Sequence, residues 1–375
     1  MVDLLFNWSE MHDLTLLELK RGLVLKLIIQ AKEKAGNLNR VCLKTGLTYP
    51  SLYNFINGKH KLISVYKLKK ILTFLDLPYE FVNDEISEVR KGAIPSIISP
   101  KFPIDLTTRE GAYLIGNILS DGTVYKDKKS RNVLRTKYSS SDPEQITFFL
   151  NNLNQIYGQI HHISEINGKN VYLKIGTTVV GESLRKVGVP VGNKTTLNYN
   201  LPVFLFDSEN DVKISYLRAI YSDEGSVGHP LPEIVLTRCK HINNDLTKEE
   251  NDLLESKFVP LMKVRIISTT GHVLRSISFP KLNKLFPDNS LLNKIKQIAV
   301  PKLLSDESRL LSSLGIETRI YITTLSKTTL GRYTVSATMK ISKKESIINF
   351  ANNVGFELTR KQDRLLARLT EMGWK

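Results

Sequence analysis

Two segments of this chain repeat one pattern of residues. Gly111–Gly122 reads GAYLIGNILSDG and Ser215–Gly225 reads SYLRAIYSDEG. Each is an apolar helix pattern that ends with an acidic residue followed by glycine. Small residues recur on one face of each predicted helix, which lets two helix backbones approach closely. They are Ala112, Gly116 and Ser120 in the first segment and Ser215, Ala219 and Ser222 in the second. Two copies roughly 100 residues apart indicate an internal duplication.

The acidic residues at the ends of these predicted helices are Asp121 and Glu224. A helix C-terminus carries partial negative charge and therefore disfavours a carboxylate. If the two helices pack in parallel, the acids also lie near each other and must take up a proton, pair with a base or bind a cation. Mg²⁺ binds such oxygen ligands together with substrate phosphates. The alternative is that both are ordinary helix ends, in which glycine supplies the left-handed turn.

The two segments also carry a family resemblance. LIGNILSDG (114–122) and LRAIYSDEG (217–225) resemble the motifs of the LAGLIDADG homing endonucleases in their single-chain, two-motif form, the enzymes of intron mobility. The resemblance implies that the two motif helices form the interface between pseudo-symmetric halves. It further implies that Asp121 and Glu224 bind the catalytic metal, Mg²⁺, for which Mn²⁺ can substitute. The first motif departs from the family at Leu119, where an acid is frequent, and has Asn117 on the same helix.

The composition indicates a polyanionic partner. The 375 residues include 53 Lys and Arg against 37 Asp and Glu, a formal net charge of +16. Such a field attracts nucleic acid, although a merely basic cytosolic protein has the same composition. The only cysteines, Cys42 and Cys239, form neither a disulfide framework nor a metal motif. The N-terminal residues lack a basic stretch, and no apolar run is long enough for a membrane span. We therefore expect a cytoplasmic or organellar-matrix protein that is not secreted.

The first 83 residues are predicted to form an all-α helix-turn-helix DNA-binding domain, with a linker at 84–106. LNRVCLKTGLTYPSLYNFINGKHK (38–61) has a helix running to Lys44, a turn at Gly46 and a second helix that Thr48 caps. The segment resembles the helix-turn-helix of phage repressors. The residues predicted to contact DNA here are Tyr53, Asn54, Lys59 and Lys61. The alternative is a helical cap or a protein-interaction bundle.

The rest of the chain is predicted to be α+β, with two repeats of the order helix-strand-strand-helix-strand-strand-helix. The first repeat occupies 107–200 and the second 201–375, with an insertion at about 243–304. An insertion of that length should carry secondary structure of its own. An antiparallel sheet can keep one face on the helices and leave the other for a ligand. The resemblance implies that the two halves together form a pseudo-twofold saddle that binds double-stranded DNA.

Basic residues on the predicted strands are candidates for phosphate contacts. They are Lys126, Lys128, Arg131, Arg135, Lys137 and Lys174 in the first repeat and Arg238 and Lys340 in the second. The family often has a lysine or glutamine at the end of the second strand of each repeat, near the attacking water. Lys240 matches that place in the second repeat and is the third predicted catalytic residue, beside Asp121 and Glu224. In the first repeat the serines 139–141 stand there, which leaves open a less efficient first half.

These observations predict a site-specific, Mg²⁺-dependent double-strand DNA endonuclease that acts as a monomer. The resemblance implies a staggered break with 3′-hydroxyl and 5′-phosphate ends. Two alternatives stay open: a DNA-binding transcriptional regulator whose duplicated domain is idle, and an RNA-binding intron maturase. The chain has no GxxxxGK[ST] loop, so ATP dependence is not expected.

Overall fold

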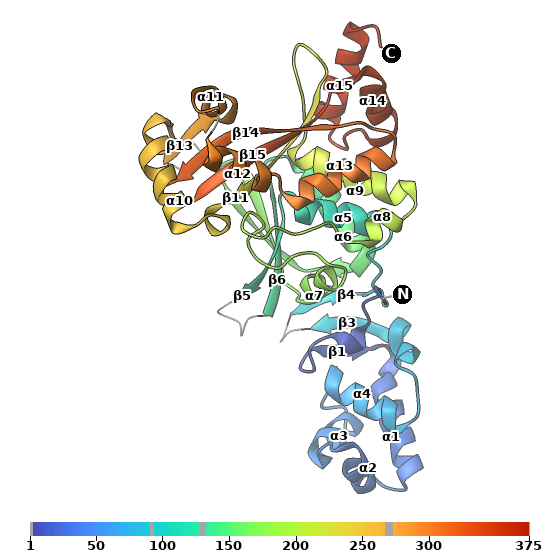
Figure 1. The fold of residues 1–375 in the computed structure, drawn as a ribbon. Helices are drawn as coiled ribbons and strands as arrows, with labels where there is room; N and C mark the ends of the chain where they lie inside the picture. The colour runs from blue at the N-terminus through green and yellow to red at the C-terminus, as the bar shows by residue number, and fades with distance from the viewer. Residues whose placement is uncertain (1–2, 91–93, 128–132, 267–272, 288, 375) are drawn as a thin grey trace. The chain divides into compact units, whose positions relative to one another are not determined.

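The computed structural model describes residues 3–90, 94–127, 133–266, 273–287 and 289–374. It is an α+β protein with three antiparallel sheets (Figure 1). The chain divides into two compact units, Met1–Ile115 with Val124–Val187, and Gly116–Thr123 with Gly188–Lys375. Within the described residues, no helix is both long and apolar enough to cross a membrane.

Four helices near the N-terminus form a small bundle. They are α1 (Leu23–Ala35), α2 (Leu38–Thr45), α3 (Tyr49–Ile56) and α4 (Val65–Phe74). The predicted turn is confirmed, because Gly46 ends α2 with a left-handed φ of 71° and Thr48 is the N-cap of α3. Each helix places its apolar residues inside the bundle, as Ile28, Val41, Leu52 and Leu68 show by their complete burial. The assignment of this bundle as a DNA-binding domain stays a prediction.

A five-stranded sheet lies next to the bundle, where the sequence analysis expected only helices and a linker. Its order is β2-β1-β3-β4-β7. The strands are β1 (Leu16–Leu19), β2 (Leu62–Ser64), β3 (Ile86–Arg90), β4 (Pro95–Ile98) and β7 (Gln159–Ile160). The predicted linker at 84–106 is therefore wrong over β3 and β4. Its prolines exclude a helix but not a strand, since proline is tolerated as the first residue of a strand, as at Pro95.

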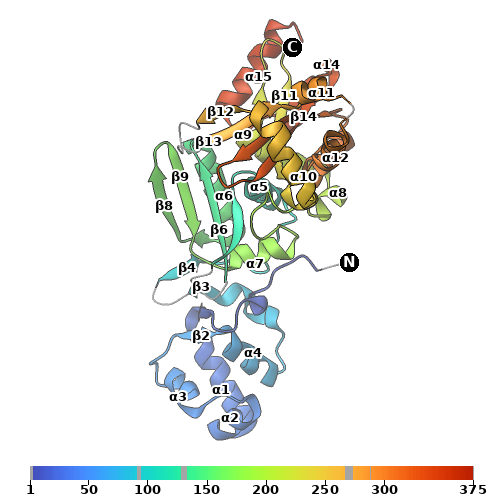
Figure 2. The same cartoon turned by 60° about the vertical axis from the view of Figure 1, so that its left-hand side comes forward.

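A four-stranded sheet follows the first motif, in the order β5-β6-β9-β8. The strands are β5 (Thr123–Asp127), β6 (Val133–Ser140), β9 (Asn170–Ile175) and β8 (His162–Asn167), as Figure 2 shows for the last three. Helices α6 (Pro143–Tyr157) and α7 (Val179–Lys186) belong to the same unit. Alternate residues of β6 are buried, and Tyr138 stacks on Phe149 of α6 at 4.2 Å between ring centroids. The other face of the sheet is left more open.

A six-stranded sheet follows the second motif, in the order β10-β11-β15-β14-β13-β12. Its strands are β10 (Ser226–Val227), β11 (Ile234–His241), β15 (Tyr333–Ile341), β14 (Arg319–Thr328), β13 (Val273–Ser278) and β12 (Lys263–Ile266). Helices of this unit are α8 (Phe204–Asp207), α9 (Asn210–Glu224), α13 (Lys302–Ser313), α14 (Lys344–Asn349) and α15 (Thr359–Glu371). A π-helical turn, Phe350–Val354, continues α14.

The insertion at 243–304 carries its own secondary structure, as expected. It contributes β12 and β13 to the sheet edge, together with α10 (Lys248–Leu253), α11 (Phe279–Leu285) and α12 (Ser290–Ile298). Phe258, Phe279 and Ile295 form a buried cluster with Leu325 of β14 and Val335 of β15. In Figure 1, β13, α10 and α11 of the insertion lie on the left, away from α9 and α13 on the right. The insertion is therefore a folded extension of the second sheet.

The two motif helices meet at one glycine. Helix α5 (Arg109–Leu119) carries the first motif and α9 the second. A Cβ built on Gly116 would lie 2.7 Å from the Cβ of Ala219 and 2.8 Å from the carbonyl oxygen of Tyr216. Only a residue without a side chain allows this approach. The prediction that small residues allow a close approach of the two helices is confirmed at Gly116 and Ala219. This close approach places the C-terminal ends of the two motifs in one compact unit.

Candidate active site

The two acidic residues lie at the C-terminal ends of α5 and α9, close enough to repel each other. Asp121 follows α5, and Glu224 is the last residue of α9. Burial in this crowded corner, followed by repulsion from Glu224, raises the pKa of Asp121 to about 6. The nearby cations Lys194, Arg238 and Lys361 oppose the rise. The Asp121 side chain nevertheless keeps solvent-exposed surface, so a ligand can reach it.

A third carboxylate, Asp223, ties the two motif helices together. The side-chain amide of Asn117 donates to its Oδ2 at 3.0 Å, and the hydroxyl of Ser120 also lies within hydrogen-bonding distance. Asn117 is completely buried. This contact gives the amide nitrogen of the buried Asn117 side chain a partner on the other motif helix. The bonds hold the end of α5 against the end of α9 and so fix the acids next to each other.

Two lysines that the sequence analysis missed complete this corner. The ammonium of Lys194 donates to carbonyl oxygens at the end of α5, Ile118 at 3.0 Å and Ser120. Lys361 does the same at the end of α9, at 2.6 Å from the oxygen of Ser222 and 2.7 Å from that of Gly225. A cation at a helix C-terminus is stabilised by the macrodipole. Burial lowers the pKa of Lys194 to about 8, although Glu224 and Asp121 act in the opposite direction.

A second repeated segment in the sequence contains these lysines. VGVPVGNK (187–194) and VGFELTRK (354–361) share Val-Gly at the start and lysine at the eighth position. The first segment follows α7. The second begins at the last residue of the π-helical turn after α14, and its lysine lies in the first turn of α15. A comparison of the two halves beyond the motif helices would have revealed the pair. The structure shows why the spacing recurs, since each lysine binds the end of a motif helix.

Arg238 requires a correction. It was predicted to contact DNA, but its side chain is 7% exposed and lies between two carboxylates. One is Glu224, and the other is the completely buried Glu307, whose two oxygens lie 2.6 and 3.3 Å from Arg238 Nη2 and Nε. The hydroxyl of Tyr216 also donates to Glu307 at 3.1 Å. Strand alternation places Arg238 on the face of β11 that the helices cover, so it holds Glu224 instead of a phosphate.

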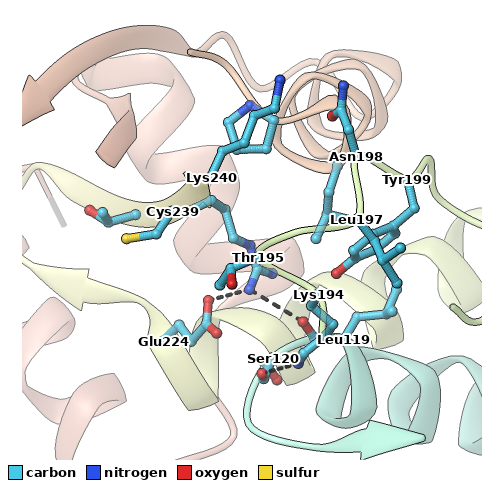
Figure 3. A pocket seen from close by; sticks show the side chains of 14 residues that line it. Leu119, Ser120, Lys194, Thr195, Leu197, Asn198, Tyr199, Glu224, Cys239 and Lys240 are labelled. Atoms are coloured by element: carbon cyan, nitrogen blue, oxygen red, sulfur yellow. Dashed lines mark hydrogen bonds and ion pairs between the residues drawn. The ribbon is translucent and has the colours of Figure 1, made fainter. Parts of the chain in front are cut away.

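Lys240 also requires a correction. Its ammonium lies 2.9 Å from the carbonyl oxygen of Ile298 and 3.0 Å from Asp245, and its side chain is buried. Figure 3 shows the Lys240 side chain directed away from Glu224. Lys240 therefore contacts residues of the insertion. The cations that act on the Asp121 carboxylate are Lys194, Lys361 and Arg238.

An open cavity of about 220 Å³ lies beside Glu224 (Figure 3). Its polar lining includes Lys194, Glu224 and Arg238, and Thr195, Asn198 and Tyr199 come from the segment that follows Lys194. Within this lining, Arg238 contacts the carboxylate of Glu224 and lies 3.5 Å from the carbonyl oxygen of Leu119. The cavity thus gives solvent access to one of the two predicted metal ligands.

The predicted DNA contacts fall into several groups. Arg135, Lys137 and Lys174 share the open face of the first sheet, since Lys137 is the register partner of Lys174. Lys126 is exposed but lies on the other face of β5 by strand alternation. Lys128 and Arg131 lie outside the described residues. Lys340 is on the open face of the second sheet, paired with Glu233 at 2.7 Å.

The residues proposed for the N-terminal bundle lie on or beside α3. Tyr53 is 45% exposed and stacks on Tyr49 at 5.6 Å between ring centroids. Asn54 is half-buried, and its carbonyl oxygen accepts from the amides of Lys59 and His60 at the end of the helix. Lys59 and Lys61 are exposed. The arrangement offers aromatic and cationic groups on one accessible segment.

The carboxylates fit a hard divalent cation better than a soft one. Among the described residues, no group of three or more His, Cys, Asp or Glu side chains is arranged to hold a metal ion. Asp121 and Glu224 alone match the way Mg²⁺ is held, by one or two carboxylates with water and substrate phosphates. The pKa of Asp121 is raised first by burial and then by repulsion from Glu224, so its ionised carboxylate is disfavoured. A bound cation would relieve that repulsion.

The raised pKa of Asp121 predicts a pH-dependent gain in stability for Asp121→Asn in the metal-free protein. The native wild-type protein binds the Asp121 proton more tightly than the unfolded chain does. The contribution of this proton to the stability of the native state is therefore fully present below about pH 4 and is lost as the pH rises through about 6. Asparagine carries no charge at any pH. We expect a gain of at most about 1 kcal/mol at about pH 8, because the exposed surface of Asp121 screens the repulsion. The measurement is thermal unfolding in EDTA at about pH 4 and pH 8.

The matched control is Asp207→Asn, which removes an exposed carboxylate from the end of α8. It should change the melting temperature little at either pH. A melting temperature of Asp121→Asn that is unchanged or lower at about pH 8 would contradict the inferred crowding of charge.

Comparison with known proteins gives only distant similarities. No protein-family model and no curated protein matches the chain. It is similar to the homing endonuclease I-DmoI in complex with DNA and Ca, at 13% identity over 67% of this chain and 91% of that chain, with a TM-score of 0.36.

Two further structures are similar at the same level. The meganuclease I-SmaMI bound to uncleaveable DNA has 10% identity over 70% of this chain and 91% of that chain, with a TM-score of 0.32. Full-length DUF199/WhiA from Thermatoga maritima has 13% identity over 71% of this chain and 64% of that chain, with a TM-score of 0.34. At such TM-scores the backbones superpose too poorly for residue roles to be transferred.

Proposed function

We propose that this protein is a site-specific endonuclease that cuts double-stranded DNA in a reaction dependent on Mg²⁺ or Mn²⁺. The observation that carries the proposal is the pair of acids at the ends of two closely packed motif helices. Asp121 and Glu224 repel each other, and each motif helix end binds a lysine. Carboxylates with cations around them are suited to a metal ion and a phosphodiester. The internal repeat, the net charge of +16 and the motif resemblance support the same conclusion.

Asp121 and Glu224 would hold the metal ion, which supplies Lewis-acid polarisation of a phosphoryl oxygen. Arg238 keeps the Glu224 carboxylate in place through their ion pair, while Glu307 fixes Arg238 from the other side. Lys194 and Lys361 provide positive charge next to the acids, where a phosphate gains negative charge during hydrolysis. The chain's own residues thus position the ligands and stabilise charge.

DNA contacts would come from the open faces of the two sheets and from the N-terminal bundle. Arg135, Lys137 and Lys174 would neutralise phosphates in the first half, and Lys340 in the second. Tyr53, Asn54, Lys59 and Lys61 would add contacts from a helix-turn-helix domain, whereas Lys126 lies on the other face of β5 and is not part of this proposed surface. We propose a monomer whose duplicated halves each read one half of the target and leave a staggered break.

The test is cleavage of a randomised duplex library by the full chain, with Mg²⁺, Mn²⁺ or EDTA. The expected result is cutting at discrete sequences with either metal and none in EDTA. Binding at one sequence without cutting would overturn the endonuclease. Preference for a structured RNA over every duplex would instead favour the maturase.

One observation favours a second candidate, a DNA-binding regulator whose duplicated core is idle. The carboxylate of Glu224 is already paired with Arg238, so a cation must compete with a resident guanidinium for this ligand. If the pair persists, the core binds DNA without cutting. Specific binding with unchanged affinity in Mg²⁺ and EDTA is the result expected from this alternative.

A further inference from the structure

The second sheet extends further from its acidic residue than the first sheet does. In the first half β5 begins two residues after Asp121, and the order from there is β5-β6-β9-β8. In the second half β10 begins two residues after Glu224, and the order is β10-β11-β15-β14-β13-β12. Counted from the acidic residue, β10, β11, β15 and β14 occupy the same places in the second sheet as β5, β6, β9 and β8 do in the first. The insertion then adds two strands on the side remote from Glu224.

A row of polar residues runs across the face of this widened sheet opposite the apolar cluster; its middle member, Ser326, is buried at 7% exposure. Register partners in an antiparallel sheet point to the same side. The row consists of His241, Thr334, Ser326, Ser276 and Lys263, one residue from each of β11, β15, β14, β13 and β12. The hydroxyl of Thr334 lies 3.0 Å from His241 Nδ1, which confirms that both point the same way. Lys263, at the outer end of the row, is exposed.

A second row has the same character and stands beside the first. It joins Cys239, Ser336, Thr324 and Ser278 through successive strand pairs. Cys239 Sγ and Ser336 Oγ lie 3.4 Å apart, and Ser278 is exposed. Hydroxyl groups both donate and accept hydrogen bonds, and they contact phosphates and base edges alike. The added strands therefore prolong a face with the chemistry of nucleic-acid contacts.

The insertion helices support the added strands from the opposite face. Ile277 of β13 and Leu325 of β14 are buried in the cluster with Phe279, Leu282 and Ile295. These apolar residues alternate with the hydroxyl residues along the same strands. The insertion core thus holds β13 on its apolar side, while Ser278 on the polar side stays exposed.

We infer that β12 and β13 lengthen the DNA-contacting surface of the second half, so that the recognition site is longer on that side. This inference rests on the proposed function. Two strands at a spacing of about 4.8 Å add roughly 10 Å to the sheet. At about 3.4 Å per base pair, this length corresponds to roughly three base pairs. The two half-sites therefore differ in length although the chain is duplicated.

The test uses the target selected from the duplex library, shortened by one base pair at a time from each end. Binding of the full-length protein in EDTA is measured for each duplex. For each side, the limit is the number of base pairs from the cutting position below which affinity falls. The expected result is that this limit is roughly three base pairs larger on one side than on the other. Lys263→Ala with Ser276→Ala should abolish only that extra dependence. Lys174→Ala, on the first sheet, should weaken binding without changing the limit of the longer side.

The outcomes separate this inference from the proposed function. Equal limits on both sides, together with cutting in Mg²⁺, would overturn the inference and leave the endonuclease intact. Unequal limits that the Lys263 and Ser276 variant does not change would also overturn it, because the extra length would then come from another element. Failure to bind any duplex would overturn both. Unchanged melting of the variant checks that the exposed strand β12 still folds.

Discussion

Asp121→Asn and Glu224→Gln are each expected to reduce Mg²⁺-dependent cutting on the order of 10³-fold while DNA binding persists. Both changes keep the size of the side chain and remove its charge. Repulsion from Glu224 contributes to the raised pKa of Asp121, which places the two carboxylates close to each other, and we expect both to act on one cation. Loss of either should therefore stop the cutting of both strands. The measurement is single-turnover cleavage of supercoiled and linear DNA that contains the selected target.

Asp207→Asn is the matched control for this experiment, since it also removes a carboxylate from a helix end of the same unit. It should cut at the rate of the wild type. A nicked product that accumulates in only one of the two acid variants would show separate metal sites for the two strands. Full cutting by either variant would remove that residue from the proposed metal site.

Arg238→Met is expected to destabilise the native state by about 3–5 kcal/mol. The change leaves Glu307 without its bidentate partner at a position with no solvent exposure. Burial, the largest effect on this group, raises the pKa of Glu307, and Arg238 now opposes that rise. Without Arg238 the native state takes up a proton at Glu307 more readily than the unfolded chain. The loss should therefore be largest at high pH and shrink as the pH falls, as measured by urea unfolding.

A surface pair on the same sheet supplies the control. Lys340 and Glu233 lie 2.7 Å apart with side chains 35% and 30% exposed, so Lys340→Met should cost less than about 1 kcal/mol. The double variant Arg238→Met with Glu307→Leu should regain part of the loss, because no buried charge then remains unpaired. Equal stability of Arg238→Met and wild type would show that Glu307 is solvated in the native state.

Part of the candidate site could be predicted because it depends on local sequence. Asp121 and Glu224 each follow an apolar helix pattern, and the small residues at 116 and 219 indicate close packing of the two helices. These features require only helical periodicity and the exclusion of a side chain at Gly116. The helices α2 and α3 were likewise predicted from Gly46 and Thr48, whose conformations are set by neighbouring residues.

Other residues could not be assigned without the packing. Lys194 and Lys361 reach the helix ends from segments more than 70 residues from Asp121 and Glu224. Arg238 and Lys240 are two residues apart on β11, so strand alternation places both side chains on the same face of the sheet. Only the tertiary packing shows that this face is buried. The strands at 86–90 and 95–98 pair with each other and also with β1 and β7, which come from distant parts of the sequence.

The two motif helices, their terminal acids, the α+β composition and the strong positive charge could be predicted from the sequence alone. These follow from local periodicity, from composition and from the internal repeat. Only the tertiary structure decided which cations surround the acids, which face of each strand is covered, and that the insertion widens the second sheet. The physical reason is that a charged side chain acts on whatever lies within a few ångströms of it, and those neighbours come from distant parts of the chain.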